Sequence, residues 1–364
     1  MNAQKSVSGV FFMKEHLLFR AGTAALEIVR DKGLDQNDVD IIAGAAGGPK
    51  WLVLSRLDRA LFTDFLKERA RPLFLVGSSI GTWRFVAAAQ KNAAAAFERF
   101  EESYINQKYS SKPLPEEISV ESKRILDFYL GGGAVYEVLS HPYLRLNILA
   151  DRSLRMLATH SVKKIMAGLG AAASMNAFSR KTMKLFFART LFYDSRDLPP
   201  FFDMDDFPTV KAALTPENIR AAIMASGAIP AVMSGVENIA GAPEGIYRDG
   251  GMIDYHIDIP FKSKGLVLFP HFFGRVIPGW FDKYVPWRKA SNMAKTLLVY
   301  PSPEFVESLP FKKIPDRKDF YKFAGKDEER IEYWRTVVER CRRLEDDFLE
   351  SVYSGSIKKR VAQL

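Results

Sequence analysis

The chain has 364 residues, of which 47% are hydrophobic and 26% are charged, and its formal net charge is +9. This length and composition are typical of a globular protein with a full-sized core and exclude a disordered or fibrous chain. The single cysteine, Cys341, excludes an intrachain disulfide and a multi-cysteine metal site. Because no run of eighteen apolar residues occurs and charges interrupt the only apolar patch near the N-terminus, we expect a cytoplasmic protein without a membrane span or signal peptide.

The first third of the chain predicts helices and strands in alternation, which is the pattern of a parallel α/β sheet. In chain order, the predicted elements are a helix over 16–30, a strand over 38–44, a helix over 51–69, a strand over 72–76, and helices over 82–90, 93–107 and 116–130.

Residues 152–193 contain eight basic side chains and no acidic one, interleaved with methionine and phenylalanine. This composition predicts a basic helical insertion that contacts anionic lipid headgroups. The alternative is a helical excursion that packs on the core and keeps its lysines in water. Nucleic-acid binding is less favoured, because the basic residues alternate with methionine more than with stacking aromatics.

The second half predicts a helix over 215–226, a strand from Ile246 into Asp249, and buried strands over 265–269 and 296–300. Residues 272–288 mix aromatic and basic side chains, a mixture found at water–lipid boundaries. The alternative, more usual in soluble proteins, is an aromatic loop that packs down on the protein. A long helix is expected from Lys326 to Val352. The expected organisation is an N-terminal helix over 1–37, a central α/β domain over 38–300 that includes the basic segment, and a helical C-terminal extension over 301–364.

A G-x-S-x-G sequence, Gly77-Ser-Ser-Ile-Gly81, lies between a predicted strand and a predicted helix. The chain must reverse there in a cramped turn, so a side chain at Gly77 or Gly81 would clash and the middle residue, Ser79, is lifted out of the sheet edge. The pattern therefore predicts that Ser79 is a nucleophile. The alternative is an ordinary strand–turn–helix junction with glycines that serve packing.

Two further glycine-containing junctions could complete a site for acyl transfer. Gly47 and Gly48 can present backbone N–H groups to an oxyanion, with Lys50 adding positive charge beside them. Asp249, followed by Gly250-Gly251, can act as the base if burial raises its pKa, although Asp-Gly-Gly is more often a surface turn. Histidine is the alternative base, and His256 lies seven residues beyond Asp249.

Four blocks together resemble the patatin-like phospholipase family in order and spacing, over roughly residues 41–260. They are Gly-Gly-x-Lys after the first strand, G-x-S-x-G after the second, Ala225-Ser-x-Ala-x-Pro230, and Asp-Gly-Gly. The resemblance implies a three-layer α/β fold with a mostly parallel sheet, a Ser79–Asp249 dyad without histidine or metal, and an oxyanion loop around Gly47 and Gly48. It also implies cofactor-free hydrolysis of lipid acyl esters. The family pattern is broken at Ala46 and Trp51, which leaves substrate choice open.

Two other functions remain open on the sequence alone. One is a conventional α/β-hydrolase esterase with a Ser–Asp–His triad, in which His256 or His271 would be essential. The other is a membrane-surface binding protein in which the dyad is not used. A phosphate loop at Gly44–Lys50 is not favoured, because Pro49 replaces a required glycine.

Overall fold

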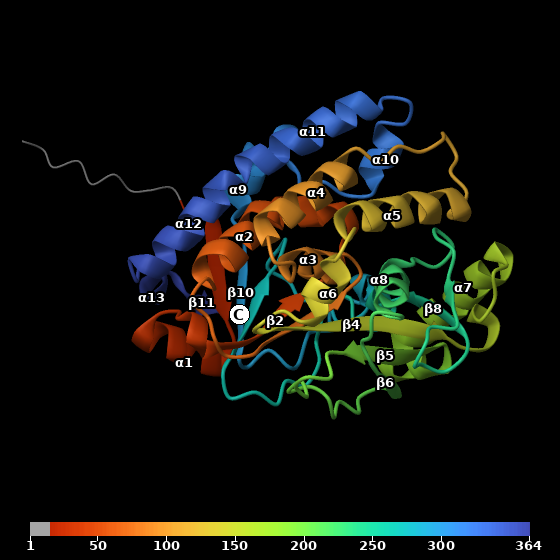
Figure 1. The fold of residues 1–364 in the computed structure, drawn as a ribbon, viewed down its shortest axis with the longest axis horizontal. Coiled ribbons are helices and arrows are strands. Elements are labelled where there is room, and N and C mark those ends of the chain that lie inside the picture. The colour runs from red at the N-terminus through yellow and green to blue at the C-terminus, as the bar shows by residue number, and fades with distance from the viewer. Residues whose placement is uncertain (1–14) are drawn as a thin grey trace, which may run out of the picture.

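The computed structural model describes residues 15–364 (Figure 1). Its centre is an eleven-stranded sheet of order β11-β1-β10-β9-β2-β3-β4-β5-β6, with β8 paired to β4 and β7 to β8. The run β10-β9-β2-β3-β4 is parallel throughout. The predicted α/β class with a mostly parallel sheet is therefore confirmed. The strands are β1 (Leu17–Ala21), β2 (Val39–Gly44), β3 (Leu73–Ser78), β4 (Leu144–Ser153), β5 (Phe187–Tyr193), β6 (Thr209–Ala213), β7 (Val236–Glu237), β8 (Ile246–Asp249), β9 (Leu266–Pro270), β10 (Thr296–Pro301) and β11 (Ala362–Gln363).

Helices α2 to α5, α11 and α12 lie together above the strands in the view of Figure 1. In the C-terminal part, α11 packs against α4 and α12 against α2. The α-helices are α1 (Thr23–Lys32), α2 (Ser55–Arg59), α3 (Ile80–Ala88), α4 (Ala93–Ile105), α5 (Pro115–Tyr129), α6 (Ala134–Leu139), α7 (Val162–Phe178), α8 (Ile219–Gly227), α9 (Pro303–Ser308), α10 (Lys318–Lys322), α11 (Asp327–Arg340), α12 (Arg342–Tyr353) and α13 (Ile357–Arg360).

The prediction of a helix over 16–30 is wrong for its first residues. Residues 1–14 lie outside the described chain, and Leu17–Ala21 form strand β1, with α1 beginning only at Thr23. Alternate residues of β1 are buried, as expected of a strand with one face on the core. The strand pairs antiparallel with β10 and parallel with β11. Both ends of the described chain therefore complete one edge of the sheet.

The segment 152–193 also differs from the predicted helical insertion. Its ends belong to β4 and β5, and its helical part is α7 flanked by two 3-10 turns. Arg189 is fully buried on β5 and forms ion pairs with Asp206 and Asp254. Arg189 is the only one of the eight basic side chains that is buried; Arg152 and Arg180 are half-buried, and the exposed ones lie on α7 and on the two 3-10 turns. The predicted helix over 326–352 is likewise two helices, α11 and α12, that meet at Cys341.

Strand β4 brings together the carboxyl ends of two strands, β3 and β8, that are far apart in sequence. One edge of β4 pairs with β5, and the other edge pairs first with β3 and then with β8. Ser78 at the end of β3 lies opposite Leu149, and Asp249 at the end of β8 lies opposite Ala150. Because β3 runs parallel and β8 antiparallel to β4, their carboxyl ends meet beside the same two residues.

Candidate active site

Ser79 lies in the turn between β3 and α3 with backbone angles φ 55° and ψ −128°. A residue other than glycine adopts such angles only when its surroundings impose them, at a cost of about 1–3 kcal/mol. The Ser79 N–H donates a 2.9 Å hydrogen bond to Ser226 Oγ on α8, and the Ser226 hydroxyl donates to Leu149 O at 2.7 Å. Ser226 thus links the strained turn to β4.

The glycines of the turn are required by close backbone approach. A Cβ at Gly77 would lie 2.5 Å from Thr82 N, and a Cβ at Gly81 would lie 2.0 Å from Gly44 O. The clash predicted at both flanking positions is therefore confirmed, because α3 passes directly against its own strand and the end of β2. Gly250 is constrained in the same way, since its Cβ would lie 2.3 Å from Leu149 O.

Asp249 and Ser79, 170 positions apart in sequence, are hydrogen-bonded. The Ser79 hydroxyl donates to Asp249 Oδ2 at 2.6 Å, and the Gly251 N–H donates to Asp249 Oδ1 at 2.7 Å. Both side chains are almost completely buried. Burial raises the pKa of Asp249 above its ordinary value, while these two hydrogen bonds and the positive charges of Arg317 and Lys283 oppose the rise. The carboxylate is fixed in place and more basic than an exposed one.

The glycine loop after β2 borders the same point. Gly48 lines a cavity together with Ser79 and opens a 3-10 helix over Gly48–Leu54 with φ 56°, a left-handed value suited to glycine. Its N–H, at the first position of that helix, has no acceptor within the helix. Gly47 and Lys50 do not line this cavity. The Lys50 amine lies instead over Phe272, 5.0 Å from the ring centroid.

The histidines do not join the dyad. In residues 15–364 no hydrogen bond links a histidine to Ser79 or Asp249. His256 and His271 are completely buried against each other, with ring centroids 4.4 Å apart. Burial lowers the pKa of both, that of His271 to about 3, so both rings are neutral. His256 Nδ1 accepts the Ile277 N–H, and the geometry of a Ser–Asp–His triad is not assembled.

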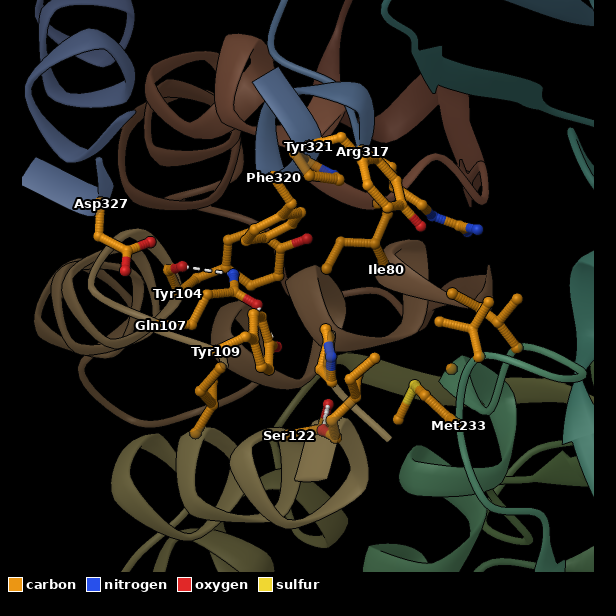
Figure 2. A pocket seen from close by; sticks show the side chains of 18 of the residues that line it. Ile80, Tyr104, Gln107, Tyr109, Ser122, Met233, Arg317, Phe320, Tyr321 and Asp327 are labelled. Carbon is orange, nitrogen blue, oxygen red and sulfur yellow. Dashed lines mark hydrogen bonds between the residues drawn. The ribbon is translucent and has the colours of Figure 1, made fainter. Parts of the chain in front are cut away.

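Ser79 lines a cavity of about 200 Å³. Figure 2 shows side chains that form its walls. The segments that line it come from α3, α4 and the loop after it, α5, the turn after α8, and the α10–α11 region. Its walls are mainly apolar and aromatic, and they include Ile80, Trp83, Tyr104, Ile125, Met233 and Phe320. An apolar cavity next to a nucleophile is suited to an alkyl chain.

Two cations near the dyad were not singled out from the sequence. Arg317 lines the cavity, and its Nε lies 3.2 Å from where a Cβ at Gly48 would be. The Lys283 amine lies 3.9 Å from the centroid of the Tyr255 ring. Both come from segments outside the four motif blocks, and the aromatic and basic pattern of residues 272–288 did not connect Lys283 with the dyad. Only the fold brings them to the site.

The chain was compared with models of known protein families and with curated protein sequences, and nothing matched. Within residues 15–364, no cluster of three histidine, cysteine or acidic side chains is placed to hold a metal ion. In the same residues, no helix combines the length and apolar character needed to cross a bilayer.

Proposed function

We propose that this chain is a patatin-like lipid acyl hydrolase that cleaves carboxylic esters through a Ser79 acyl-enzyme, with Asp249 as general base. The observation that carries the proposal is the 2.6 Å hydrogen bond from Ser79 Oγ to Asp249 Oδ2 at the mouth of an apolar cavity. A nucleophile in a strained turn and a buried base in direct contact are the parts that acyl transfer needs.

In the proposed reaction, Asp249 takes the hydroxyl proton as Ser79 Oγ attacks the ester carbonyl. The Gly48 N–H, and that of Gly47 if the loop adjusts, would stabilise the oxyanion. Asp249 then gives that proton to the departing alkoxide, which leaves as the alcohol. In the second half, Asp249 takes a proton from the water molecule that attacks the acyl carbonyl and returns it to Ser79 Oγ as the fatty acid is released. The acyl chain occupies the cavity lined by Ile80, Trp83 and Phe320.

The helix α7 supports a second part of the proposal, contact with an anionic membrane surface. Phe178 is 91% exposed and Met166 is 57% exposed, with Lys163 and Lys164 exposed on the same helix. Exposed apolar side chains beside lysines bind the headgroup region of anionic bilayers.

Ester hydrolysis by matched variants tests the dyad. We expect Ser79→Ala and Asp249→Asn to lower kcat/KM by about 10⁴-fold, as removal of a nucleophile or its base does. His256→Asn and His271→Asn, folded by circular dichroism, should stay within about tenfold of the wild type, because neither ring contacts the dyad. Loss of activity in either folded histidine variant equal to that of Ser79→Ala would favour a triad instead.

A further inference from the structure

Three cations from separate parts of the chain gather around the Ser79–Asp249 pair. Arg317 packs against Gly48, as described above. Lys50 lies over the Phe272 ring, which in turn packs against Gly47, since a Cβ there would lie 2.6 Å from the ring. Lys283 lies over Tyr255, whose ring would be 3.4 Å from a Cβ at Gly251. The cations therefore surround both glycine loops at the dyad.

Two carboxylates, Asp316 acting on Lys50 and Asp249 acting on Lys283, offset these positive charges only in part. In the described part of the chain, none of the three forms an ion pair with a carboxylate. The nearest acidic groups are otherwise engaged: Asp249 accepts the Ser79 hydroxyl, and Asp316 pairs with Lys313 at 3.4 Å. All three cations are half-buried, so water screens them only partly. An incoming anion would relieve the repulsion among them.

The cluster borders the acyl cavity at Arg317, which is one of the residues that line it. Figure 2 shows the Arg317 guanidinium pointing away from Tyr104 and Phe320, which form the aromatic part of the cavity. Lys50 and Lys283 do not line the cavity. An ester whose acyl chain fills the cavity would therefore direct its alcohol part toward the cations.

We propose that Lys50, Lys283 and Arg317 form a subsite that binds an anionic group, a phosphate or a carboxylate, on the alcohol part of the ester. The inference rests on the proposed hydrolase function and specifies its substrate class as anionic amphiphilic esters. Guanidinium and ammonium groups with no carboxylate partner are the groups that recognise such anions.

Binding to the full chain carrying Ser79→Ala tests the subsite without turnover. The probes are 1-decanoylglycerol 3-phosphate and neutral 1-decanoylglycerol, which differ only in the phosphate, with decanoyl-lactate as a carboxylate and inorganic phosphate alone. We expect the phosphate ester to bind at least about tenfold more tightly than the neutral ester. Adding Arg317→Gln or Lys283→Gln should remove most of this preference. The control Lys318→Gln, at the exposed neighbour of Arg317, should keep it.

The possible outcomes of this binding experiment either support the anion subsite or overturn it. Equal affinity for the charged and neutral esters, or a preference that survives both substitutions, overturns the subsite. Inorganic phosphate that binds through Arg317 as tightly as the ester assigns the site to free phosphate and also overturns it. Tight binding of decanoyl-lactate supports an anion site that accepts carboxylates. Wild type that hydrolyses no ester, while the Arg317-dependent preference is present, removes the hydrolase proposal and leaves the anion site.

Discussion

The chemistry of Ser79 depends on the protonation of Asp249, and the surroundings of that carboxylate act in opposite directions. Burial raises the pKa of Asp249, whereas the hydrogen bonds from Ser79 and Gly251 and the charges of Arg317 and Lys283 lower it, with a net rise. A general base works only when ionised, so activity should fall as the pH drops through this raised pKa. Removal of a nearby cation should raise the pKa further.

The pH profile of kcat/KM on a neutral ester therefore gives the first residue-scale prediction. We expect its acidic limb to lie above the range of an exposed aspartate, and Arg317→Gln to move that limb to higher pH. Lys318→Gln should leave it in place, because that side chain is exposed and contributes nothing to the pKa of Asp249. A limb that moves to lower pH in Arg317→Gln would contradict the electrostatic account.

Lys283 gives a second prediction, which concerns the preference for a charged ester at pH values above neutrality. Burial, followed by the charges of Lys50 and Arg317, lowers the pKa of Lys283 to about 7, against the raising effect of Asp249. The amine is therefore charged below about pH 7 and neutral above it. The ratio of kcat/KM for charged over neutral ester should decline as the pH rises through this value, and Lys283→Arg should retain the ratio to higher pH. A ratio constant from pH 6 to 9 would exclude Lys283 from anion binding.

Ser226 is a positioning residue, and its removal should affect turnover more than binding. In Ser226→Ala the Ser79 N–H and Leu149 O lose their buried partner, which costs about 1–3 kcal/mol in the free energy of unfolding. We expect kcat to fall with KM little changed, because the turn that presents Ser79 loosens. Urea denaturation and steady-state kinetics measure both effects, with Ser174→Ala on the exposed face of α7 as control. An unchanged kcat would show that the turn presents Ser79 correctly without the hydrogen bond to Ser226.

At the scale of elements, the two ends of the described chain are joined by one carboxylate. Asp347 on α12 accepts the backbone N–H groups of His16 and Leu17, each at 2.7 Å, and contacts Arg360, which also donates to Leu17 O at 2.8 Å. Burial would raise the pKa of Asp347, but the hydrogen bond and charge of Arg360 outweigh it, and the net shift is downward. A carboxyl with a lowered pKa stabilises the fold above its ordinary pKa of 3.8, and this contribution is lost as the pH falls through the lowered value.

Asp347→Ala should therefore lower the free energy of unfolding by about 3 kcal/mol at neutral pH, since it leaves Arg360 without its partner. The deficit should shrink as the pH falls below 4. Denaturant unfolding at several pH values measures it, and Asp346→Ala, at the exposed neighbouring position, is the control. If the loss in free energy of unfolding instead grew as the pH fell, ionised Asp347 would not be the stabilising form, which would contradict the account.

The exposed face of α7 carries the membrane prediction. Phe178→Asp or the pair Lys163→Glu and Lys164→Glu should weaken binding to phosphatidylglycerol vesicles by about tenfold or more, through lost apolar insertion or reversed charge. Tyr136→Asp, at an exposed aromatic on α6, should bind as the wild type does. Vesicle co-sedimentation measures this. Equal loss in all three variants would assign the effect to surface charge in general.

Elements with a strong local signal were predicted from the sequence, and those whose state depends on distant partners were not. The strands that end at Gly44 and Ser78 are short, mostly apolar segments next to glycine turns, with Asp40 as the one charged residue, and both were placed correctly. Leu17–Ala21 shows no alternation of apolar and polar residues in the sequence, because four of its five residues are apolar, and only its burial alternates. Since it directly precedes a true helix, the helix prediction included it. The ends of the basic segment 152–193 become strands because β4 and β5 pair with each other, which no local pattern reports.

At the scale of the whole molecule, the candidate site combines parts that the sequence marks and parts that only the fold assembles. Ser79 and Asp249 were predicted from their glycine-containing turns, and the shared edge of β4 explains why they meet. Arg317 and Lys283 stand in segments without a motif, and they reach the dyad because the C-terminal region and the 272–288 loop fold over it. Local patterns thus identify a nucleophile and a base, whereas charge and cavity shape depend on the complete fold.

The most direct test of the Ser79–Asp249 assignment is covalent labelling by an alkyl fluorophosphonate at neutral pH, with the modified peptide located by mass spectrometry. The wild type should be labelled at Ser79 alone, Ser79→Ala should not react, and Asp249→Asn should react far more slowly because no base is in contact with the hydroxyl. A folded wild-type protein that stays unlabelled, or equal labelling rates for the wild type and Asp249→Asn, would contradict it.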